Sequence, residues 1–321
     1  MQAFITGASG FIGSHLVDSL VQKKWRIRAL VHKNRILQQE KIEAIQGDIG
    51  DFEILRDALE GTDILFHLAS ALGSSLISKD EFYRINCRGT ENVLRAAREA
   101  NVKKIIHLSS AGVLGSVKPN EVADEDCPLN PKNIYDKSKL EGEKVALCLA
   151  NEGLDIVVLR PGWVYGPRDR RTFKLIKAID KRRFILVTKG NARQTPIYIQ
   201  DLIQGILLCA EKGKRGEIYH LAGREALTVR EIVETISSVT GKKIPSFSLP
   251  LPPVKLVAWT MEKIFSLFKK EAPLTLSKIS FFIHPKPLSI QKAGQLGFSP
   301  ETSFQEGMEM TVFWHKEQGW L

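Results

Sequence analysis

The chain has 321 residues, of which 43% are hydrophobic and 26% charged, with 24 glycines and 14 prolines. This composition is typical of a globular protein and excludes collagen-like, disordered and small disulfide-stabilised classes. The formal net charge of +10 fits an anionic ligand, an acidic surface or plain solubility, and it does not identify a fold.

Strand-like apolar runs alternate with helix-like stretches through the first half of the chain. The expected strands are residues 3–6, 27–31, 64–68, 105–108 and 156–159, and the expected helices are residues 13–21, 53–59, 80–100 and 135–150. Because these strands are apolar throughout rather than alternating, both faces of their sheet should be buried. The repeated strand–helix–strand units predict an α/β fold with a parallel sheet wrapped by helices.

The pattern changes after about Pro167. We expect helices at 173–183, 201–211, 227–240 and 254–270, and strands at 184–187, 197–199 and 217–222. Thr228 and Glu231 have the spacing of a capping box. We therefore predict a first domain of residues 1–166, with later returns near 197–222. Residues 167–321 would form most of a smaller, partly interleaved domain over the carboxyl edge of the sheet.

The segment 254–270 carries apolar residues near helical spacing, with lysines between them. The apolar residues are Val254, Val257, Met261, Ile264, Phe265 and Phe268. The favoured interpretation is a helix that faces the core of the small domain. Two alternatives are an apolar lid over a hydrophobic substrate and a helix that lies on a membrane surface.

The cysteines and the first residues indicate a cellular compartment. Cys87, Cys127, Cys148 and Cys209 are far apart and form no zinc-ligand pattern, so we predict free thiols, a reducing compartment and no metal site. No signal-peptide pattern is present, and no apolar run reaches the ~18 residues of a spanning helix. We expect a cytoplasmic protein with at most peripheral membrane contact, and no nucleic-acid partner.

A glycine-rich turn follows the first strand and begins the first helix, in the sequence TGASGFIG at residues 6–13. Gly7 permits a tight turn, Gly10 lets the backbone approach a pyrophosphate, and Gly13 lets the helix pack close to the strand. Amide groups at the helix start favour phosphate. The position at the first strand–helix junction predicts a dinucleotide site.

The end of the second strand bears on which dinucleotide binds. NAD sites usually place an acid here, whereas the 2′-phosphate of NADP prefers cations. This stretch offers His32, Lys33 and Arg35 and no acid, which favours NADP over NAD, although a solvated basic loop is the alternative. Asp48 is expected either to accept a hydrogen bond from the adenine amino group or to cap a turn.

Tyr135 and Lys139 are four residues apart on an expected helix and therefore share a face. A lysine ammonium beside a phenol should lower the phenol pKa from its usual value of about 10. Such a phenol transfers a proton to or from an alcohol oxygen. Ser109 and Ser110 follow the fourth strand, at the edge where open α/β sheets bind ligands.

The chain resembles the extended short-chain dehydrogenase/reductases, also called NAD-dependent epimerase/dehydratases. The resemblance rests on motifs in family order: TGASGFIG (6–13), GDIGD (47–51), HLAS (67–70), NCRGTENVL (86–94), HLSSAGVLG (107–115), YDKSK (135–139), RPGWVYGP (160–167), IQDLIQGI (199–206) and LGFSPETSFQEGMEMTV (296–312). It implies a doubly wound Rossmann sheet that binds NAD(P), with a smaller C-terminal α/β substrate domain.

The resemblance also implies residue roles. Tyr135 would be the catalytic acid/base, Lys139 its electrostatic partner and ribose anchor, and Ser110, rather than Ser109, the partner of the substrate oxygen. The cofactor-binding residues we predict are Gly7, Ser9, Gly10, Phe11, Ile12, His32, Lys33, Arg35, Asp48, Ile49, Leu68, Ala69, Ser70, Asn86, Ser109, Tyr135, Lys139, Pro161 and Val164. Trp163 and Arg193 are candidate substrate contacts, Trp163 equally a core residue.

The branch of the family bears on the substrate. Nucleotide-sugar epimerases usually carry an Arg-Asp pair just before the stretch that corresponds to residues 197–201; here the aspartate is absent and Arg193 is offset by one. The N-terminal pattern is more similar to that of dihydroflavonol reductase and 3β-hydroxysteroid dehydrogenase relatives, which act on apolar or aromatic ketones and secondary alcohols.

Three functions follow in order of preference. The first is an NAD(P)-dependent oxidoreductase that interconverts a carbonyl and a secondary alcohol on a small apolar or aromatic substrate. The second is a nucleotide-sugar epimerase or dehydratase with tightly bound NAD. The third is a non-catalytic dinucleotide sensor, ranked last because Tyr135 and Lys139 are both present. Helices 80–100 and 135–150 are those that relatives use to form homodimers, so we expect a homodimer.

Overall fold

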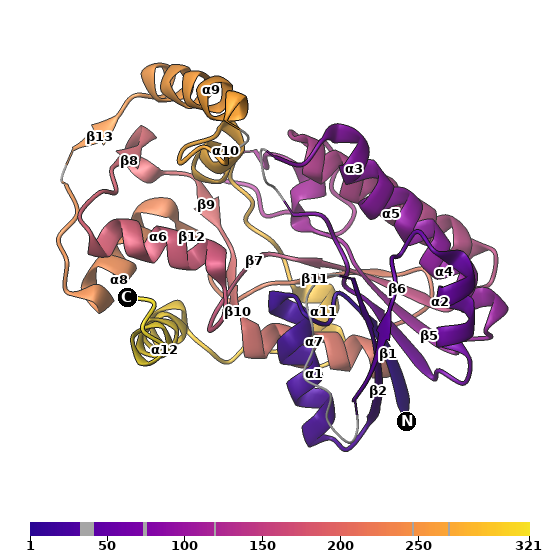
Figure 1. The fold of residues 1–321 in the computed structure, drawn as a ribbon. Coiled ribbons are helices and arrows are strands. Elements are labelled where there is room, and N and C mark those ends of the chain that lie inside the picture. The colour runs from indigo at the N-terminus through magenta and orange to yellow at the C-terminus, as the bar shows by residue number, and fades with distance from the viewer. Residues whose placement is uncertain (33–41, 73–75, 119, 246, 269) are drawn as a thin grey trace.

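A parallel sheet forms the centre of the N-terminal half (Figure 1). The computed structural model describes residues 1–32, 42–72, 76–118, 120–245, 247–268 and 270–321. Within these residues the sheet has seven strands, in the order β11 (Ile218–Leu221), β6 (Ile156–Pro161), β5 (Lys104–Leu108), β4 (Ile64–His67), β1 (Gln2–Thr6), β2 (Arg26–Val31) and β3 (Ile42–Gln46). All neighbouring pairs are parallel. The strand order reverses between β1 and β4, where doubly wound sheets bind ligands.

Helices cover both faces of this sheet (Figure 1). One face is covered by α1 (Phe11–Gln22) and α7 (Ile199–Lys212), and the other by α2 (Phe52–Leu59), α4 (Thr90–Glu99) and α5 (Ile134–Asn151). Strand β1 shows the consequence: Ile5 belongs to the apolar core beneath α1, whereas Phe4 belongs to the core beneath α4 and α5. Burial on both faces explains the uninterrupted apolar strands, and the predicted fold class is confirmed.

A π-helical turn interrupts the long helix expected at residues 80–100. The segment consists of α3 (Lys79–Tyr83), a π-helical turn (Arg84–Gly89) and α4. The turn packs tightly on α5, because a side chain at Gly142 would lie 2.0 Å from the Asn86 carbonyl oxygen. Sequence periodicity does not reveal a single wide turn of this kind.

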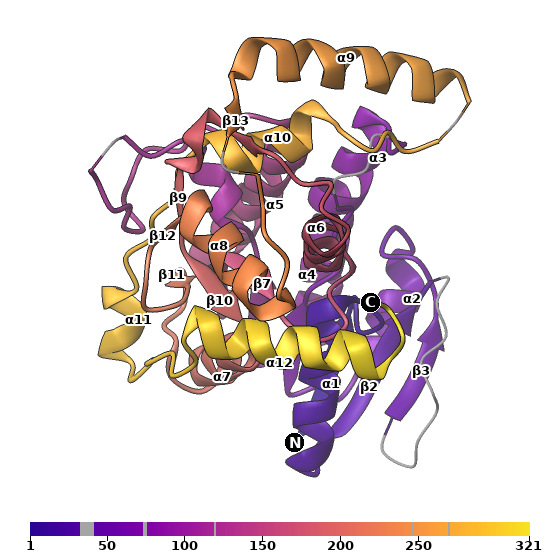
Figure 2. The same cartoon turned by 90° about the vertical axis from the view of Figure 1, so that its left-hand side faces the viewer.

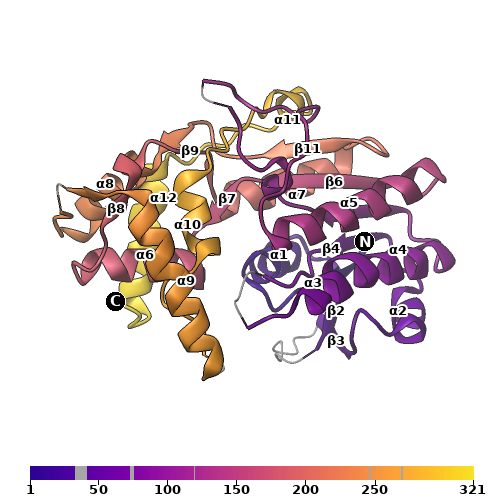
Figure 3. The same ribbon diagram turned by 90° about the horizontal axis from the view of Figure 1, so that it is seen from above.

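The C-terminal elements form a second lobe beside the sheet (Figure 3). Its helices are α6 (Arg170–Asp180), α8 (Val229–Thr240), α9 (Leu251–Leu267), α10 (Leu276–Ile283) and α12 (Phe304–Glu317), with α11 (Gln291–Gln295) beside β11. Three short strand pairs support them: β7 (Trp163–Tyr165) with β10 (Pro196–Tyr198), β9 (Arg193–Gln194) with β12 (Leu227–Thr228), and β8 (Leu186–Val187) with β13 (Ser248–Leu249). Thr228 and Glu231 form the expected capping box. The domain boundary near residue 166 stays a prediction.

The favoured interpretation of residues 254–270, a helix that faces the core of the small domain, is wrong for helix α9. Only Val254 and Ala258 of this helix are buried, and the rest of its surface is half-buried or exposed. Apolar residues near helical spacing indicate a helix, but they do not show which side packs against the protein. No helix in the described ranges is long and apolar enough to cross a membrane.

Two buried histidines lie side by side in the centre of the sheet. The rings of His67 on β4 and His107 on β5 stack with centroids 5.3 Å apart. His67 is hydrogen-bonded through Nδ1 to Thr6 Oγ1 (2.7 Å) and through Nε2 to Thr90 Oγ1 (3.0 Å). Neither ring nitrogen of His107 has a partner among the described residues. Burial, and then the Lys139 charge, lower the pKa of His67 to about 3 and that of His107 well below its usual value.

These histidines predict that acid destabilises the fold. Their folded pKa values lie below the usual ~6.5, so the unfolded chain binds more protons below that pH. Their stabilisation is complete above pH ~6.5 and declines as the pH falls toward about 3 for His67. At pH 5 His67 should lower the free energy of unfolding by about 2 kcal/mol, and His107 should act in the same direction. His107→Phe should therefore lose less stability between pH 7 and pH 5 than the parent, measured by urea unfolding.

The control is Phe313→Leu at an exposed position, which removes no ionisable group and should lose as much stability as the parent over the same pH interval. An equally steep loss in His107→Phe would show that the buried ring does not contribute to the acid response.

Candidate active site

A large cleft of about 1850 Å³ lies at the carboxyl edge of the sheet. Its sheet-side wall comes from the turn after β1, the chain after β4, β5 and β6, and the start of α5. Its opposite wall includes Arg168–Arg171, at the start of α6, and Ser277, Ser280 and Phe281 of α10. The cleft thus joins the first strand–helix junction to the Tyr135 helix and to the C-terminal lobe.

The glycine turn has no room for side chains at two positions. Gly7 has φ +76°, and a Cβ atom there would lie 2.7 Å from the Ala69 amide nitrogen. A Cβ at Gly13 would lie 2.1 Å from the Gly7 carbonyl oxygen. The first glycine therefore allows the turn to approach the chain after β4, and the last allows α1 to pack against the turn.

The start of α1 fits a phosphate group. Gly10 is its N-cap and makes no side-chain capping bond, and the first turn of the helix contains no acidic residue. The free amide groups and the positive end of the helix dipole therefore face the cleft without a competing anion. This cradle fits the pyrophosphate of a dinucleotide.

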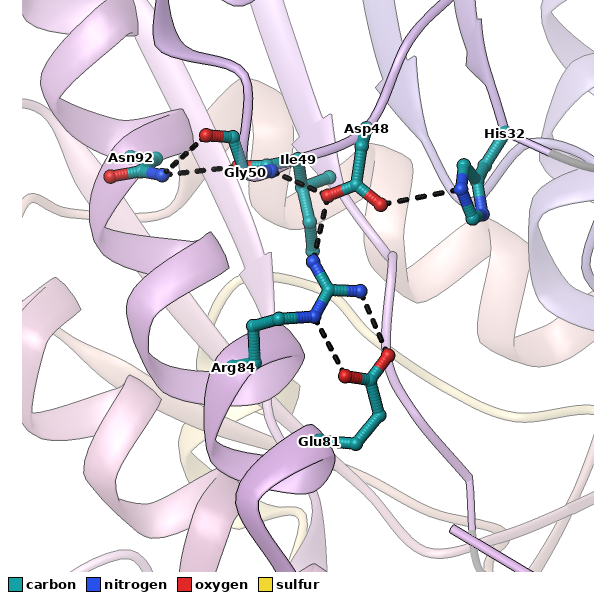
Figure 4. Close-up of polar contacts among 7 residues, drawn as sticks. All are labelled: His32, Asp48, Ile49, Gly50, Glu81, Arg84 and Asn92. Atoms are coloured by element: carbon teal, nitrogen blue, oxygen red, sulfur yellow. Dashed lines mark hydrogen bonds and ion pairs between the residues drawn. The ribbon is translucent and has the colours of Figure 1, made fainter. Parts of the chain in front are cut away.

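An ion-pair network surrounds the turn after β3 (Figure 4). Asp48 Oδ1 accepts hydrogen bonds from Arg84 Nη1 (2.9 Å) and the Gly50 amide (2.7 Å), and Arg84 also donates to both oxygens of Glu81 (2.7 and 2.8 Å). Partial burial acts to raise the pKa of Asp48, but the bonds from Arg84 and Gly50 outweigh it, so the pKa is lowered. Asp48 therefore caps the turn, which was one of the two roles expected from the sequence. The other role, a contact with adenine, stays a prediction.

Of the three residues expected to hold a 2′-phosphate, only His32 lies within the described residues. His32 Nε2 lies 3.4 Å from Asp48 Oδ2, so its ring points toward this carboxylate (Figure 4). Lys33 and Arg35 lie outside the described residues. Among the described residues, the end of β2 carries no acid, which leaves the preference for NADP as a prediction.

Tyr135 lies in the first turn of α5, which Asn133 caps through a hydrogen bond from the Asp136 amide (2.9 Å). Its half-buried side chain lines the cleft, where the hydroxyls of Ser110 and Ser70 act to lower the pKa of its phenol. Ser109 instead donates to Glu143 Oε2 at 2.6 Å. The serine hydroxyl beside the phenol is therefore that of Ser110, the one preferred from the sequence.

The expected lowering of the Tyr135 pKa by Lys139 is not found. Burial raises the pKa of Tyr135, and the Arg171 charge is the first influence that opposes it. Lys139 is itself buried, and its ammonium donates to the Leu108 carbonyl oxygen at 2.6 Å. Burial lowers the Lys139 pKa to about 8, against the opposing charge of Glu143. The i,i+4 spacing was correct, but desolvation dominates both groups.

A buried ion pair holds α5 against the sheet behind this pair. Arg160 on β6 donates to both carboxylate oxygens of Glu143 on α5, at 2.6 and 3.1 Å. Both side chains are almost fully buried. Arg160 Nη1 also donates to the Glu125 carbonyl oxygen (3.1 Å). Because Ser109 shares the same carboxylate, the Tyr135 helix and the ends of β5 and β6 are fixed together.

Most predicted residues line the cleft. Those that do are Gly7, Ser9, Gly10, Phe11, Ile12, His32, Asp48, Ile49, Leu68, Ala69, Ser70, Ser109, Ser110, Tyr135, Lys139, Pro161, Trp163 and Val164. Asn86 does not: it is fully buried, accepts from the Ala71 amide (2.8 Å) and donates to Ser138 Oγ (2.9 Å). It supports the wall from behind because the π-helical turn directs it inward.

Arg193 also lies away from the cleft. Its guanidinium donates to the Ala226 carbonyl oxygen (3.0 Å) on the exposed side of the β9–β12 pair. Since neighbouring side chains on a strand point to opposite faces, the next residue, Gln194, lines the cleft instead. Its amide donates to the carbonyl oxygens of Phe281 (2.7 Å) and His284 (2.9 Å).

Several cleft residues were missed from the sequence. Lys286 and Asp136 both line the cleft: burial lowers the pKa of Lys286 and raises that of Asp136, and each charge opposes the shift of the other. Phe281 packs edge-on against Trp163 with ring centroids 4.9 Å apart. No local signal marks Phe281 or Lys286, because only the fold brings them to the site.

Among the described residues no group of three acidic, histidine or cysteine side chains could hold a metal.

Comparison with known proteins adds family information. Residues 3–222 match the family model "NAD dependent epimerase/dehydratase family". A 4-hydroxy-2-methyl-3-oxo-4-farnesyl-3,4-dihydroquinoline-1-oxide ketoreductase of Stigmatella aurantiaca is 29% identical, over 96% of this chain and 95% of its own length. A putative dihydroflavonol 4-reductase of Synechocystis is 28% identical (99% and 95%). A 3 beta-hydroxysteroid dehydrogenase/Delta 5→4-isomerase of Mycobacterium tuberculosis is 26% identical (85% and 78%).

A solved structure has the same fold. The dTDP-glucose 4,6-dehydratase DesIV of Streptomyces venezuelae, solved with NAD and TYD bound, superimposes with a TM-score of 0.81 at 25% identity, covering 100% of this chain and 98% of its own. The resemblance inferred from the motifs is therefore confirmed. The relatives found include a putative dihydroflavonol reductase and a 3β-hydroxysteroid dehydrogenase, the two kinds of enzyme that the N-terminal pattern resembled.

Glu143→Gln tests the ion pair. Removing the negative charge leaves Arg160 buried without compensation, so we expect a loss of about 3–5 kcal/mol in the free energy of unfolding. Urea unfolding measures it. Glu141→Gln is the matched control: it lies on the same helix in an exposed ion pair with Lys144 and should change stability by less than about 1 kcal/mol. Equal losses in the two variants would contradict the role of Glu143.

Proposed function

Because this chain belongs to the NAD-dependent epimerase/dehydratase family, and is therefore an NAD(P)-dependent enzyme of the extended short-chain dehydrogenase/reductase type, we propose that it interconverts a carbonyl and a secondary alcohol on a small apolar or aromatic substrate. One observation carries the proposal: Tyr135 and Ser110 line the same cleft as the dinucleotide cradle. The aromatic wall of Trp163 and Phe281 supports the substrate class.

In this proposal Tyr135 moves the proton. A bound nicotinamide supplies or accepts the hydride. The raised pKa keeps the Tyr135 phenol protonated at neutral pH, so its hydroxyl is ready to donate to a carbonyl oxygen as that oxygen gains charge. Ser110 holds the same oxygen through its hydroxyl. In the reverse direction, the deprotonated oxygen of Tyr135 takes the proton of the alcohol as the hydride leaves its carbon.

In this proposal Lys139 anchors the nicotinamide ribose and adds positive charge beside the reacting groups. Its ammonium lies at the end of β5, held by the Leu108 carbonyl oxygen, where it can bind the hydroxyls of a nicotinamide ribose. With its pKa lowered to about 8, it is mostly protonated at pH 7 and adds positive charge beside the site.

The substrate class is supported from two sides. The ketoreductase relative is named for a farnesylated quinoline oxide and the putative reductase for a dihydroflavonol, and both names denote largely apolar molecules. Arg193, which occupies nearly the position of an epimerase phosphate ligand, is engaged with Ala226 away from the cleft. This arrangement weakens the nucleotide-sugar alternative, although the NAD-bound dehydratase DesIV has the same fold.

NADP is the cofactor that we propose within the NAD(P) class. Asp48, whose carboxylate lies 3.4 Å from His32, and Glu81 are both held by Arg84 (Figure 4). His32 is then the described side chain that can meet a 2′-phosphate. We further propose a homodimer through α4 and α5 and a cytoplasmic location, the latter supported by four free cysteines.

Tyr135→Phe tests the proton-transfer role. The variant keeps the ring but loses the hydroxyl, so turnover should fall by about 10²–10⁴-fold, while the dissociation constant for the cofactor should change little. A carbonyl reduction assay and a fluorescence titration with NADPH measure the two quantities. Tyr83→Phe, on the neighbouring α3, is the control and should keep full turnover. A Tyr135→Phe enzyme as active as the parent would refute the proposed role.

The cofactor preference is tested by titration. Unmodified protein should bind NADPH more tightly than NADH, because cations at the end of β2 attract the 2′-phosphate. His32→Ala should weaken NADPH binding and leave NADH binding unchanged. A screen of apolar and aromatic ketones with the preferred cofactor then tests the reaction. Tightly bound NAD in the purified protein, with no net consumption of NADPH, would favour the epimerase or dehydratase instead.

A further inference from the structure

Helix α9 carries an unusual concentration of exposed apolar side chains. Six large apolar residues, five in the helix and one directly after it, form what we call the α9 patch: Leu256, Val257, Trp259, Ile264, Leu267 and Phe268. Their exposed fractions run from 49% for Val257 to 81% for Leu267. Solvent-exposed apolar residues are ordinary when scattered, but a contiguous group of this size marks an interaction surface.

The patch results from how the helix is attached. Val254 and Ala258, four residues apart, pack with Ile279 of α10 in a small apolar cluster of their own. Glu262 accepts a hydrogen bond from the Leu276 amide (2.9 Å) at the start of α10. Figure 2 shows α9 lying across the edge of the molecule, beside α10. The helix is thus fixed by one narrow stripe, and the remaining faces point outward.

Helical spacing places the exposed residues in two lines, one opposite this stripe and one beside it. Leu256 and Leu267 are eleven residues apart, about three turns, and so lie in one line opposite Val254 and Ala258. Val257, Ile264 and Phe268 follow a second line at intervals of seven and four. The second line flanks the buried stripe, and Lys263 lies on the outward line between the two leucines, so the exposed surface combines apolar side chains with a lysine.

The charge around the patch is positive. Lys255, Lys263 and Lys270 are exposed, whereas Glu262, the acid of α9, is bonded to α10. Positive charge also gathers on neighbouring elements: after burial, the charges of Lys286, Lys132 and Lys255 lower the pKa of His284. Two copies of this surface would bring like charges together, so an anionic partner fits better than a second copy.

We propose that α9 binds the surface of a bilayer that contains anionic phospholipid. The apolar side chains enter the boundary between headgroups and acyl chains, while the lysines meet lipid phosphates. The helix lies on the membrane and does not cross it, in keeping with the finding on spanning helices in the described residues. Since α10 both holds α9 and lines the cleft through Phe281, the cleft is brought close to the bilayer.

This last step rests on the proposed function: an apolar substrate dissolved in lipid would reach the cleft from the membrane side. Lipid binding itself does not depend on the reaction, so it is measured without substrate or cofactor. The full-length protein is floated with vesicles of phosphatidylcholine alone and of an equimolar mixture of phosphatidylcholine and phosphatidylglycerol.

The unmodified protein should float with the mixed vesicles, more weakly with phosphatidylcholine alone, and less as salt is raised. The double variant Leu256→Gln, Leu267→Gln should bind at least about tenfold more weakly, because it removes apolar area from the interface. Phe313→Gln is the matched control. Phe313 is 67% exposed on α12, and its replacement should leave vesicle binding unchanged. Both variants should keep turnover of a water-soluble ketone.

Three results would overturn the inference. One is that the unmodified protein fails to float with the mixed vesicles. Another is that the double variant floats as well as the parent. The third is that the parent is a dimer by size-exclusion chromatography with light scattering and the double variant a monomer, which would assign the patch to a second copy. An enzyme inactive on every ketone that still floats with the vesicles would refute the proposed function and leave this inference standing.

Discussion

The site depends on the buried ion pair between Arg160 and Glu143. A guanidinium and a carboxylate taken out of water are stabilising only when their geometry is good and their remaining hydrogen bonds are made. Both conditions hold, because Glu143 also accepts from Ser109 and Arg160 also donates to Glu125. The pair fixes the rotation of α5 about its own axis, and that rotation decides where Tyr135 and Lys139 point.

A second polar residue, Asn86, completes this support from the opposite side of α5. Its amide bonds to Ala71 after β4 and to Ser138 on α5. Ser138 precedes Lys139 directly, so the chain beneath the dinucleotide cradle and the helix that carries the phenol share one buried group. The cradle and the proton donor therefore hold a constant position relative to each other.

The sequence predicts the parts of this protein that depend on neighbouring residues. The glycine turn, the capping box and the spacing of Tyr135 and Lys139 are local patterns, and the structure contains all of them. The parallel sheet followed from apolar strands with no alternation. The preference for Ser110 over Ser109 came from the resemblance to the family, and its role at the substrate oxygen stays a prediction.

What the sequence missed depends on distance in the chain and on burial. Nothing local shows that Glu143 meets Arg160, or that α10 contributes Phe281 to a cleft that begins at Gly7. Spacing placed Lys139 beside Tyr135 but gave no measure of desolvation, so the direction of the phenol pKa was wrong. Burial was also unpredictable for α9, because the periodicity of its apolar residues indicated a helix but did not show which side packs against the rest of the protein.

The two walls of the cleft come from separate stretches of chain and are held by separate contacts. The sheet-side wall is bound by the Glu143 and Asn86 networks, whereas α10 is held through Gln194, which donates to the carbonyl oxygens of Phe281 in α10 and of His284 directly after it. Substitutions along α10 can therefore reshape the space for a substrate while the proton donor stays in place. Such a division lets descendants of one ancestral gene acquire new substrates without rebuilding their chemistry.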